Sequence, residues 1–165
     1  MRIAGLVQDS IVDGPGLRFV VFAQGCNLRC EGCHNPDTWD INGGEDKTVE
    51  ELIAEMARNP LTDGVTISGG EPLLQAGECA RLAADARGRG LNVWLYSGYT
   101  IEQLMDRSGS EPEIMELLEL CDVLVDGPFK LDERTLQLKW RGSKNQRLID
   151  VQKSLASGAA AVVDN

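Results

Sequence analysis

Cys26, Cys30 and Cys33 lie within eight residues of one another, directly after an apolar segment rich in β-forming residues. Thiolate sulfur is the usual ligand of iron–sulfur clusters and a common ligand of structural zinc, and both normally take four protein ligands. His34 follows Cys33 too closely to complete such a set comfortably. Three thiolates on a cubane cluster would leave one iron open to an exogenous ligand. The spacing therefore favours a [4Fe–4S] cluster, with zinc as the alternative.

The other two cysteines have a different setting. Cys79 and Cys121 each fall on the apolar stripe of a predicted helix, and a buried free cysteine behaves as a small hydrophobic residue. The N-terminal segment soon reaches the polar residues Gln8 and Asp9 and has no secretory signal pattern. In a reducing cytosol, clustered cysteines indicate a metal site rather than disulfides. We expect a cytoplasmic protein in which Cys79 and Cys121 are structural.

The composition is that of a globular protein. The 165 residues are 42% hydrophobic and 25% charged, and 26 acidic against 16 Lys and Arg residues give a formal net charge of −10. An acidic chain lacks the basic footprint of nucleic-acid binding, and no window approaches about 18 consecutive apolar residues, as a membrane span would require. We expect neither a nucleic-acid nor a membrane partner.

Apolar β-rich segments alternate with helical patterns along most of the chain. This order predicts parallel βα units, and the length is too short for a complete eight-stranded barrel, which needs about 250 residues. We predict a partial (open) βα-barrel with a mostly parallel sheet, one domain over residues 1–153 and a frayed tail over residues 154–165. The predicted strands are 17–23, 65–67, 92–96 and 122–125, and the predicted helices begin near Thr48, Glu78, Thr100 and Ser110, three of them with capping boxes.

The turns after the four strands carry the unusual residues. They hold the cysteines, Gly69-Gly70-Glu71-Pro72, residues 96–99, and Asp126-Gly127. In parallel βα architectures, ligands bind at the C-terminal ends of the strands. The enrichment of four successive turns predicts one site at that edge.

Three segments of the sequence resemble a known superfamily. Residues 10–40, SIVDGPGLRFVVFAQGCNLRCEGCHNPDTWD, look like the cluster loop of radical S-adenosylmethionine enzymes that activate glycyl-radical enzymes. TISGGEPLL, residues 66–74, resembles the GGEP segment of that superfamily. DVLVDGPFKLDERTLQLKWRGSKNQRLI, residues 122–149, resembles the ending of the branch that activates anaerobic ribonucleotide reductases. The resemblance implies a partial barrel of the radical S-adenosylmethionine type.

The resemblance also implies a mechanism. Cys26, Cys30 and Cys33 would each ligate one iron of a [4Fe–4S] cluster, and the fourth iron would bind the amino and carboxylate groups of S-adenosylmethionine. Reductive cleavage would then give a 5′-deoxyadenosyl radical, which removes hydrogen from a backbone glycine of an anaerobic ribonucleotide reductase. The electron would come from a donor such as flavodoxin or ferredoxin.

Further site residues follow from the same resemblance. Gly69 and Gly70, with Glu71, would let the backbone pass close to the methionyl group, where a Cβ would intrude. Gly32, Cys33 and His34 would lie against the adenine, although many relatives carry an aromatic residue where this chain has Gly32. Asp126 would lie near the cofactor or a monovalent cation, unless it only forms the turn before Gly-Pro. Residues 13–16 would form the rim that receives the glycine loop, unless they are an ordinary tight turn.

Two other functions remain open on the sequence alone. One is a pyruvate formate-lyase activating enzyme, which has the same chemistry and another partner. The other is a non-enzymatic zinc or cluster-binding module. Residues 129–153 also hold seven basic side chains against three acidic ones. This segment is either a solvated face or a surface, around residues 141–147, that docks the reductase or an acidic electron donor.

Overall fold

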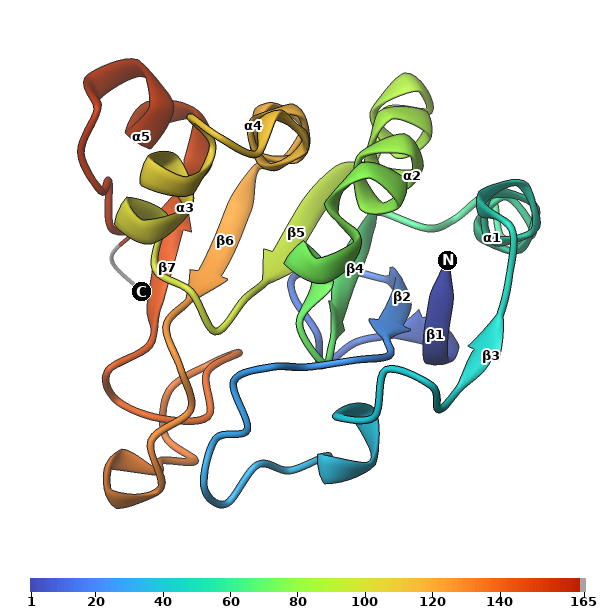
Figure 1. Cartoon of the computed structure of the whole chain (residues 1–165). Coiled ribbons are helices and arrows are strands. Elements are labelled where there is room, and N and C mark those ends of the chain that lie inside the picture. Colours follow the sequence, from blue (N-terminus) through green and yellow to red (C-terminus); the bar gives the residue numbers. More distant parts are fainter. Residues whose placement is uncertain (164–165) are drawn as a thin grey trace.

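The computed structural model describes residues 1–163 and is organised around one seven-stranded sheet (Figure 1). The strands are β1 (Arg2–Ser10), β2 (Arg18–Ala23), β3 (Glu45–Asp46), β4 (Gly64–Gly69), β5 (Asn92–Tyr96), β6 (Val123–Asp126) and β7 (Arg147–Asp150). Their order across the sheet is β3-β1-β2-β4-β5-β6-β7.

The centre of this sheet is parallel. Strands β2, β4, β5 and β6 pair in parallel, whereas β1, β3 and β7 add antiparallel pairs at the two sides. The expected α/β architecture with a mostly parallel central sheet is confirmed. The sheet is open, with β3 and β7 as its end strands.

The helices lie together on one side of the sheet (Figure 1). They are α1 (Val49–Met56), α2 (Ala76–Gly88), α3 (Ile101–Arg107), α4 (Pro112–Glu119) and α5 (Val151–Ser157), and short 3₁₀ turns cover residues 36–38, 72–75 and 131–133. Alternate strand residues, such as Val93 and Leu95, join the helices in the main core. Cys79 and Cys121 are fully buried in this core, which confirms their structural setting. None of the helices in residues 1–163 is long and apolar enough to cross a membrane.

The predicted helix starts are mostly confirmed. The Thr48 hydroxyl accepts a hydrogen bond from the Glu51 backbone N–H at 3.0 Å, which is one half of the predicted capping box, and Thr100 forms the complete reciprocal box with Gln103. The capping box predicted at Ser110 is wrong. Helix α4 begins at Pro112, because proline has a helical φ already and needs no N–H partner at the first position.

The C-terminal segment differs from the prediction. Residues 154–163 are not frayed: helix α5 runs to Ser157 and ends at Gly158 with φ +75°. The chain then returns to the sheet, where Val162 bridges Ile149. Residues 164–165 lie outside the described part. Strands β1, β3 and β7 and helix α5 were not predicted. Strands β3 and β7 and helix α5 are short, and β1 lacks a regular alternation of apolar and polar residues.

Candidate cluster and cofactor site

A cavity of about 380 Å³ opens on the helix-free side of the sheet, at the C-terminal ends of the parallel strands. Its floor is one row of side chains: Phe22 pairs with Ser68 across β2 and β4, and Tyr96 pairs with Val125 across β5 and β6. Its volume lies within the range of about 300–1,000 Å³ that is usual for small-molecule and cofactor sites. The cavity lies at the C-terminal ends of the strands, where the sequence predicts a site.

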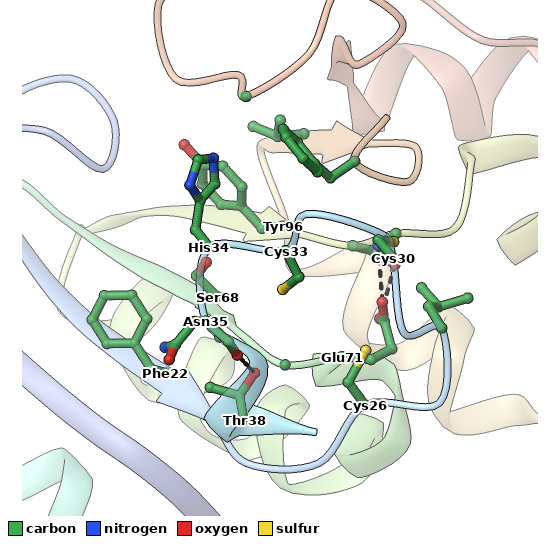
Figure 2. A pocket seen from close by; sticks show the side chains of 18 of the residues that line it. Phe22, Cys26, Cys30, Cys33, His34, Asn35, Thr38, Ser68, Glu71 and Tyr96 are labelled. Atoms are coloured by element: carbon green, nitrogen blue, oxygen red, sulfur yellow. Dashed lines mark hydrogen bonds between the residues drawn. The ribbon is translucent and has the colours of Figure 1, made fainter. Parts of the chain in front are cut away.

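All three cysteines of the CxxxCxxC segment line this cavity (Figure 2). The loop that carries them leaves β2 and returns beside its own start: the Gly25 N–H donates to the Thr38 carbonyl at 2.6 Å, and the Cys26 N–H donates to the Trp39 carbonyl at 3.2 Å. Within the loop, the Cys33 N–H donates to the Cys30 carbonyl at 3.1 Å. The loop is therefore closed at its base.

The thiols suit an iron–sulfur cluster. Each is a free, half-buried cysteine, and no other described cysteine faces the cavity. Burial raises the pKa of Cys30, and the neighbouring Cys26 and Cys33 thiols raise it further. In residues 1–163, no three His, Cys, Asp or Glu side chains converge as they would on a single metal ion. A cubane cluster does not require such convergence, because each thiolate would bind a different iron.

The glycine pair at the end of β4 packs directly on the start of the cysteine loop. The Gly70 N–H donates to the Ala23 carbonyl and the Glu71 N–H donates to the Gly25 carbonyl, both at 2.8 Å. Gly69 has a φ of +106°, and a Cβ there would lie 2.5 Å from the Ala23 carbonyl oxygen. A Cβ on Gly70 would lie 2.9 Å from the Gly25 carbonyl carbon. Both glycines line the cavity, but the protein's own backbone, rather than room for a ligand, requires glycine at these positions.

Glu71 is the buried carboxylate of the cavity wall. It is 1% exposed and accepts hydrogen bonds from the Ser97 hydroxyl at 2.8 Å, the Gly98 N–H at 2.9 Å and the Leu73 N–H at 3.2 Å. Burial raises the pKa of Glu71 to about 6, and these three donors limit the rise. Glu71 thus ties the turn after β4 to the turn after β5.

The cysteine loop also rests on the turn after β5. The Asn27 amide donates to the Tyr99 hydroxyl at 2.9 Å, and the Leu28 side chain packs so tightly on Gly98 that a Cβ on this glycine would collide with it. Leu28 and Gly98 both line the cavity. The cysteine loop, the Gly69–Glu71 turn and the Ser97–Tyr99 turn therefore form one packed unit.

Of the three residues expected at the adenine, two line the cavity and one does not. Cys33 and His34 line the cavity, and the His34 ring packs on Phe129 with ring centroids 5.0 Å apart. Gly32 does not line it. With a φ of +74°, Gly32 turns toward Leu131, whose Cδ1 would lie 2.7 Å from a Cβ on Gly32.

Asp126 is not part of the cavity lining either. Its carboxylate is 1% exposed and accepts from the Ile101 N–H at 2.9 Å and from the Arg147 guanidinium at 3.0 and 2.6 Å. Arg147 also pairs with Glu102 at 2.8 Å. Asp126 therefore holds the start of α3 and strand β7 together, and its neighbour Gly127 is the residue that lines the cavity.

Comparisons with known proteins agree with this site. Residues 12–149 match the family described as a 4Fe-4S single cluster domain. The chain is 35% identical to the anaerobic ribonucleoside-triphosphate reductase-activating protein of Enterobacteria phage T4 over 83% of this chain and 86% of that protein. It is also 35% identical to the protein of that name from Salmonella typhimurium over 88% of this chain and 96% of the relative.

A second group of relatives is named for a different partner protein, pyruvate formate-lyase. The chain is 37% identical to the pyruvate formate-lyase 1-activating enzyme of Escherichia coli over 94% of this chain, and it spans 63% of that enzyme. The chain belongs to the radical S-adenosylmethionine activases of glycyl-radical enzymes. As an activase it is an enzyme of the oxidoreductase class, which sets aside the non-enzymatic module. The family match confirms the iron–sulfur cluster and S-adenosylmethionine as cofactors.

Three residues of the WRGSKNQ segment of the activase, residues 140–146, line the cavity: Trp140, Gly142 and Gln146. The Gln146 side-chain oxygen accepts from the Gly142 and Ser143 N–H groups at 2.8 and 3.1 Å, and its amide donates to the Gly127 carbonyl at 3.1 Å. The Asn145 amide donates to the Pro128 carbonyl at 2.7 Å. Sequence reasoning used this segment as a family signature and missed its role in holding the wall.

The basic segment of the activase is only partly available to a partner. Gly142 and Gln146 border the cavity, as expected, and Lys144 is exposed. Arg147 is instead committed to Asp126 and Glu102 within the fold.

Arg18 is a further residue that sequence reasoning missed. It is fully buried, and it donates to the Pro15 carbonyl at 2.8 Å and to the Thr66 hydroxyl at 2.7 Å. Thr66 donates in turn to the Asp13 carbonyl at 2.8 Å, and Asp13 lines the cavity. Arg18 therefore fastens the 13–16 turn to the sheet. The sequence signal that could have identified this role is an arginine at the start of an otherwise apolar strand.

Proposed function

We propose that the activase generates a glycyl radical on an anaerobic ribonucleotide reductase, with a [4Fe–4S] cluster held by Cys26, Cys30 and Cys33 and S-adenosylmethionine bound beside it. One observation carries this proposal: the three cysteines and the Gly69–Glu71 turn line the same cavity. A partial barrel of the radical S-adenosylmethionine type agrees with an open sheet that carries helices on one side only.

The cofactors would supply the electron and the 5′-deoxyadenosyl radical, and the chain would supply orientation and a shielded site. The buried Glu71 carboxylate would hold the turn that carries the glycine pair in place through its bonds to Ser97 and Gly98. The turn Gly69–Glu71 is held at the cavity by the bonds of the Gly70 N–H to Ala23 and of the Glu71 N–H to Gly25. His34 and Phe129 would form the wall at the adenine.

The choice of partner rests on the WRGSKNQ segment, which resembles the reductase branch and forms the wall of the cavity. Relatives named for the reductase match most of the chain. Pyruvate formate-lyase is the second candidate partner, because the identity to its activating enzyme is 37% over 94% of the chain. For the electron donor we propose a flavodoxin or a ferredoxin.

The cluster is tested by reconstitution under anaerobic conditions. Cys30→Ala should lose most of the bound iron and the visible absorption of the cluster, since a cubane cluster held by two thiolates is poorly anchored. Cys121→Ala is the matched control, a fully buried cysteine away from the cavity, and should retain both. Full iron retention in Cys30→Ala would contradict the ligand assignment.

The partner is tested by electron paramagnetic resonance. After reduction in the presence of S-adenosylmethionine, a glycyl-radical signal should appear on an anaerobic ribonucleotide reductase. A signal that appears on pyruvate formate-lyase alone would transfer the activase to the second candidate. Formation of 5′-deoxyadenosine without any radical on either protein would leave only the cofactor chemistry standing.

A further inference from the structure

Trp140 combines two features that the proposed function leaves unexplained. Its backbone has a φ of +62°, a left-handed conformation that a bulky residue rarely adopts. Its half-buried side chain lines the same cavity as the three cysteines. Such conformations persist only where the surrounding structure holds them, and they concentrate at functional sites.

The surroundings of Trp140 hold it firmly. Its ring packs edge-on against Trp94, with ring centroids 4.9 Å apart and an interplanar angle of 76°. The backbone of the loop that carries Trp140 is also closed, because the Thr135 N–H donates to the Gly142 carbonyl at 3.0 Å. Gln146 binds the two residues after Arg141 by their backbone N–H groups. The ring is therefore a rigid part of the cavity wall rather than a mobile surface side chain.

We propose that Trp140 is a specificity-determining residue: its ring contacts the backbone of the partner at the radical-site glycine and leaves no room for a side chain there. This inference rests on the proposed function. In the step concerned, a hydrogen atom leaves the glycine Cα and bonds to the 5′ carbon of the deoxyadenosyl radical. Transfer needs the two carbons to approach to about 3–3.5 Å.

A rigid aromatic wall favours glycine for a simple reason. Glycine is the residue without a Cβ, so its backbone can approach a flat surface that any other residue would strike first. Extra carbon in a packed site that cannot yield is strongly disfavoured. A wall of flexible side chains would give way, whereas Trp140 is fixed by Trp94 on one side and by the closed loop on the other.

The experiment uses the reconstituted activase and two synthetic peptides that span the radical site of an anaerobic ribonucleotide reductase. One peptide carries Cα-deuterated glycine at the radical site and the other carries Cα-deuterated alanine. Mass spectrometry of 5′-deoxyadenosine measures deuterium transfer per molecule of S-adenosylmethionine cleaved. Fluorescence anisotropy of labelled peptides measures their affinity without any turnover.

Trp140→Ala should reduce the preference for the glycine peptide by about tenfold or more, in deuterium transfer and in affinity, as expected when a site stops rejecting one extra carbon. Trp140→Phe should retain part of the preference. Leu136→Ala is the control on the same loop, because Leu136 is 88% exposed and does not line the cavity, and it should keep the full preference.

An unchanged preference in Trp140→Ala would overturn the proposal. So would a parallel loss of transfer and of S-adenosylmethionine cleavage, because that result would make Trp140 a purely structural residue. Wild-type protein that cleaves no S-adenosylmethionine would instead refute the proposed function, which separates the two failures.

Discussion

Comparison of the wild type with Glu71→Gln should show that ionisation of the Glu71 carboxylate lowers the free energy of unfolding. Burial raises the pKa of Glu71 from 4.5 to about 6 in the folded protein. Between these two values the folded state keeps a proton that the unfolded state has lost. The contribution of Glu71 to stability is therefore fully present below pH about 4.5 and is lost as the pH rises through about 6.

The magnitude follows from the pKa difference. A rise of about 1.5 units, at about 1.36 kcal/mol per unit, corresponds to about 2 kcal/mol in total. The chain has an isoelectric point near 4.5, so measurements are best made between pH 5 and 7.5. Linkage places about 1 kcal/mol of the total within this window.

The assay is anaerobic urea unfolding of wild type and Glu71→Gln across this window. The free energy of unfolding of the wild type should fall by about 1 kcal/mol relative to that of Glu71→Gln as the pH rises. All other titrating groups are common to both proteins and cancel in this difference. Glu111→Gln is the flat control: Arg107 lowers the pKa of the exposed Glu111, so this carboxyl titrates below the window and the difference from the wild type should stay nearly constant across it. A constant difference for Glu71→Gln, or one that favours the wild type at high pH, would refute the burial argument.

Two further substitutions test the packing around the site. Arg147→Met should destabilise by about 2–3 kcal/mol, near the low end for breaking a buried ion pair because Arg147 is 30% exposed, whereas exposed Lys144→Met should change stability by less than about 0.5 kcal/mol. Urea unfolding measures both, and equal effects would mean that the pair with Asp126 contributes nothing. Gly69→Ala should prevent folding or cost more than about 4 kcal/mol, because it combines a forbidden φ with a backbone collision. Gly88→Ala, where a Cβ meets nothing within 4 Å, should be neutral or stabilising by up to about 1 kcal/mol; circular dichroism melts compare the two, and a folded Gly69→Ala of wild-type stability would contradict the geometry.

Local signals were enough to predict the parallel centre of the fold. The strand over residues 92–96 was predicted with its observed bounds, and Thr100 marked the start of α3 through a capping box. These elements are defined by neighbouring residues. Strand β1 depends instead on pairing with β2 in a ladder that two register shifts interrupt, and β7 depends on pairing with β6 across the loop of residues 127–146. No regular local pattern of residues 2–10 or 147–150 reveals these strands.

Site residues were predictable where the residue type alone carries the chemistry. They were missed where the role depends on which way the side chain points. The three cysteines and the Gly69–Glu71 turn line the cavity as expected. Asp126 has the right residue type at the right strand end, yet its carboxylate is used by Ile101 and Arg147. Whether a carboxylate faces a cavity or its own scaffold is decided by partners that a single sequence does not identify.

The register of the central strands is the step that converts these local signals into a site. Phe22 and Ser68 are directly paired, as are Tyr96 and Val125, and all four lie on the helix-free side as the cavity floor. Since side chains alternate between faces, a slip of one residue in any of these strands would turn its floor residue into the helical core. The same slip would move the turn that follows by about 3.3 Å along the sheet. It would separate Glu71 from Ser97 and Gly98, whose bonds to it span 2.8 and 2.9 Å. The apolar core residues that lock the register therefore also set the geometry of the cluster site, and stability and function depend on the same pairing.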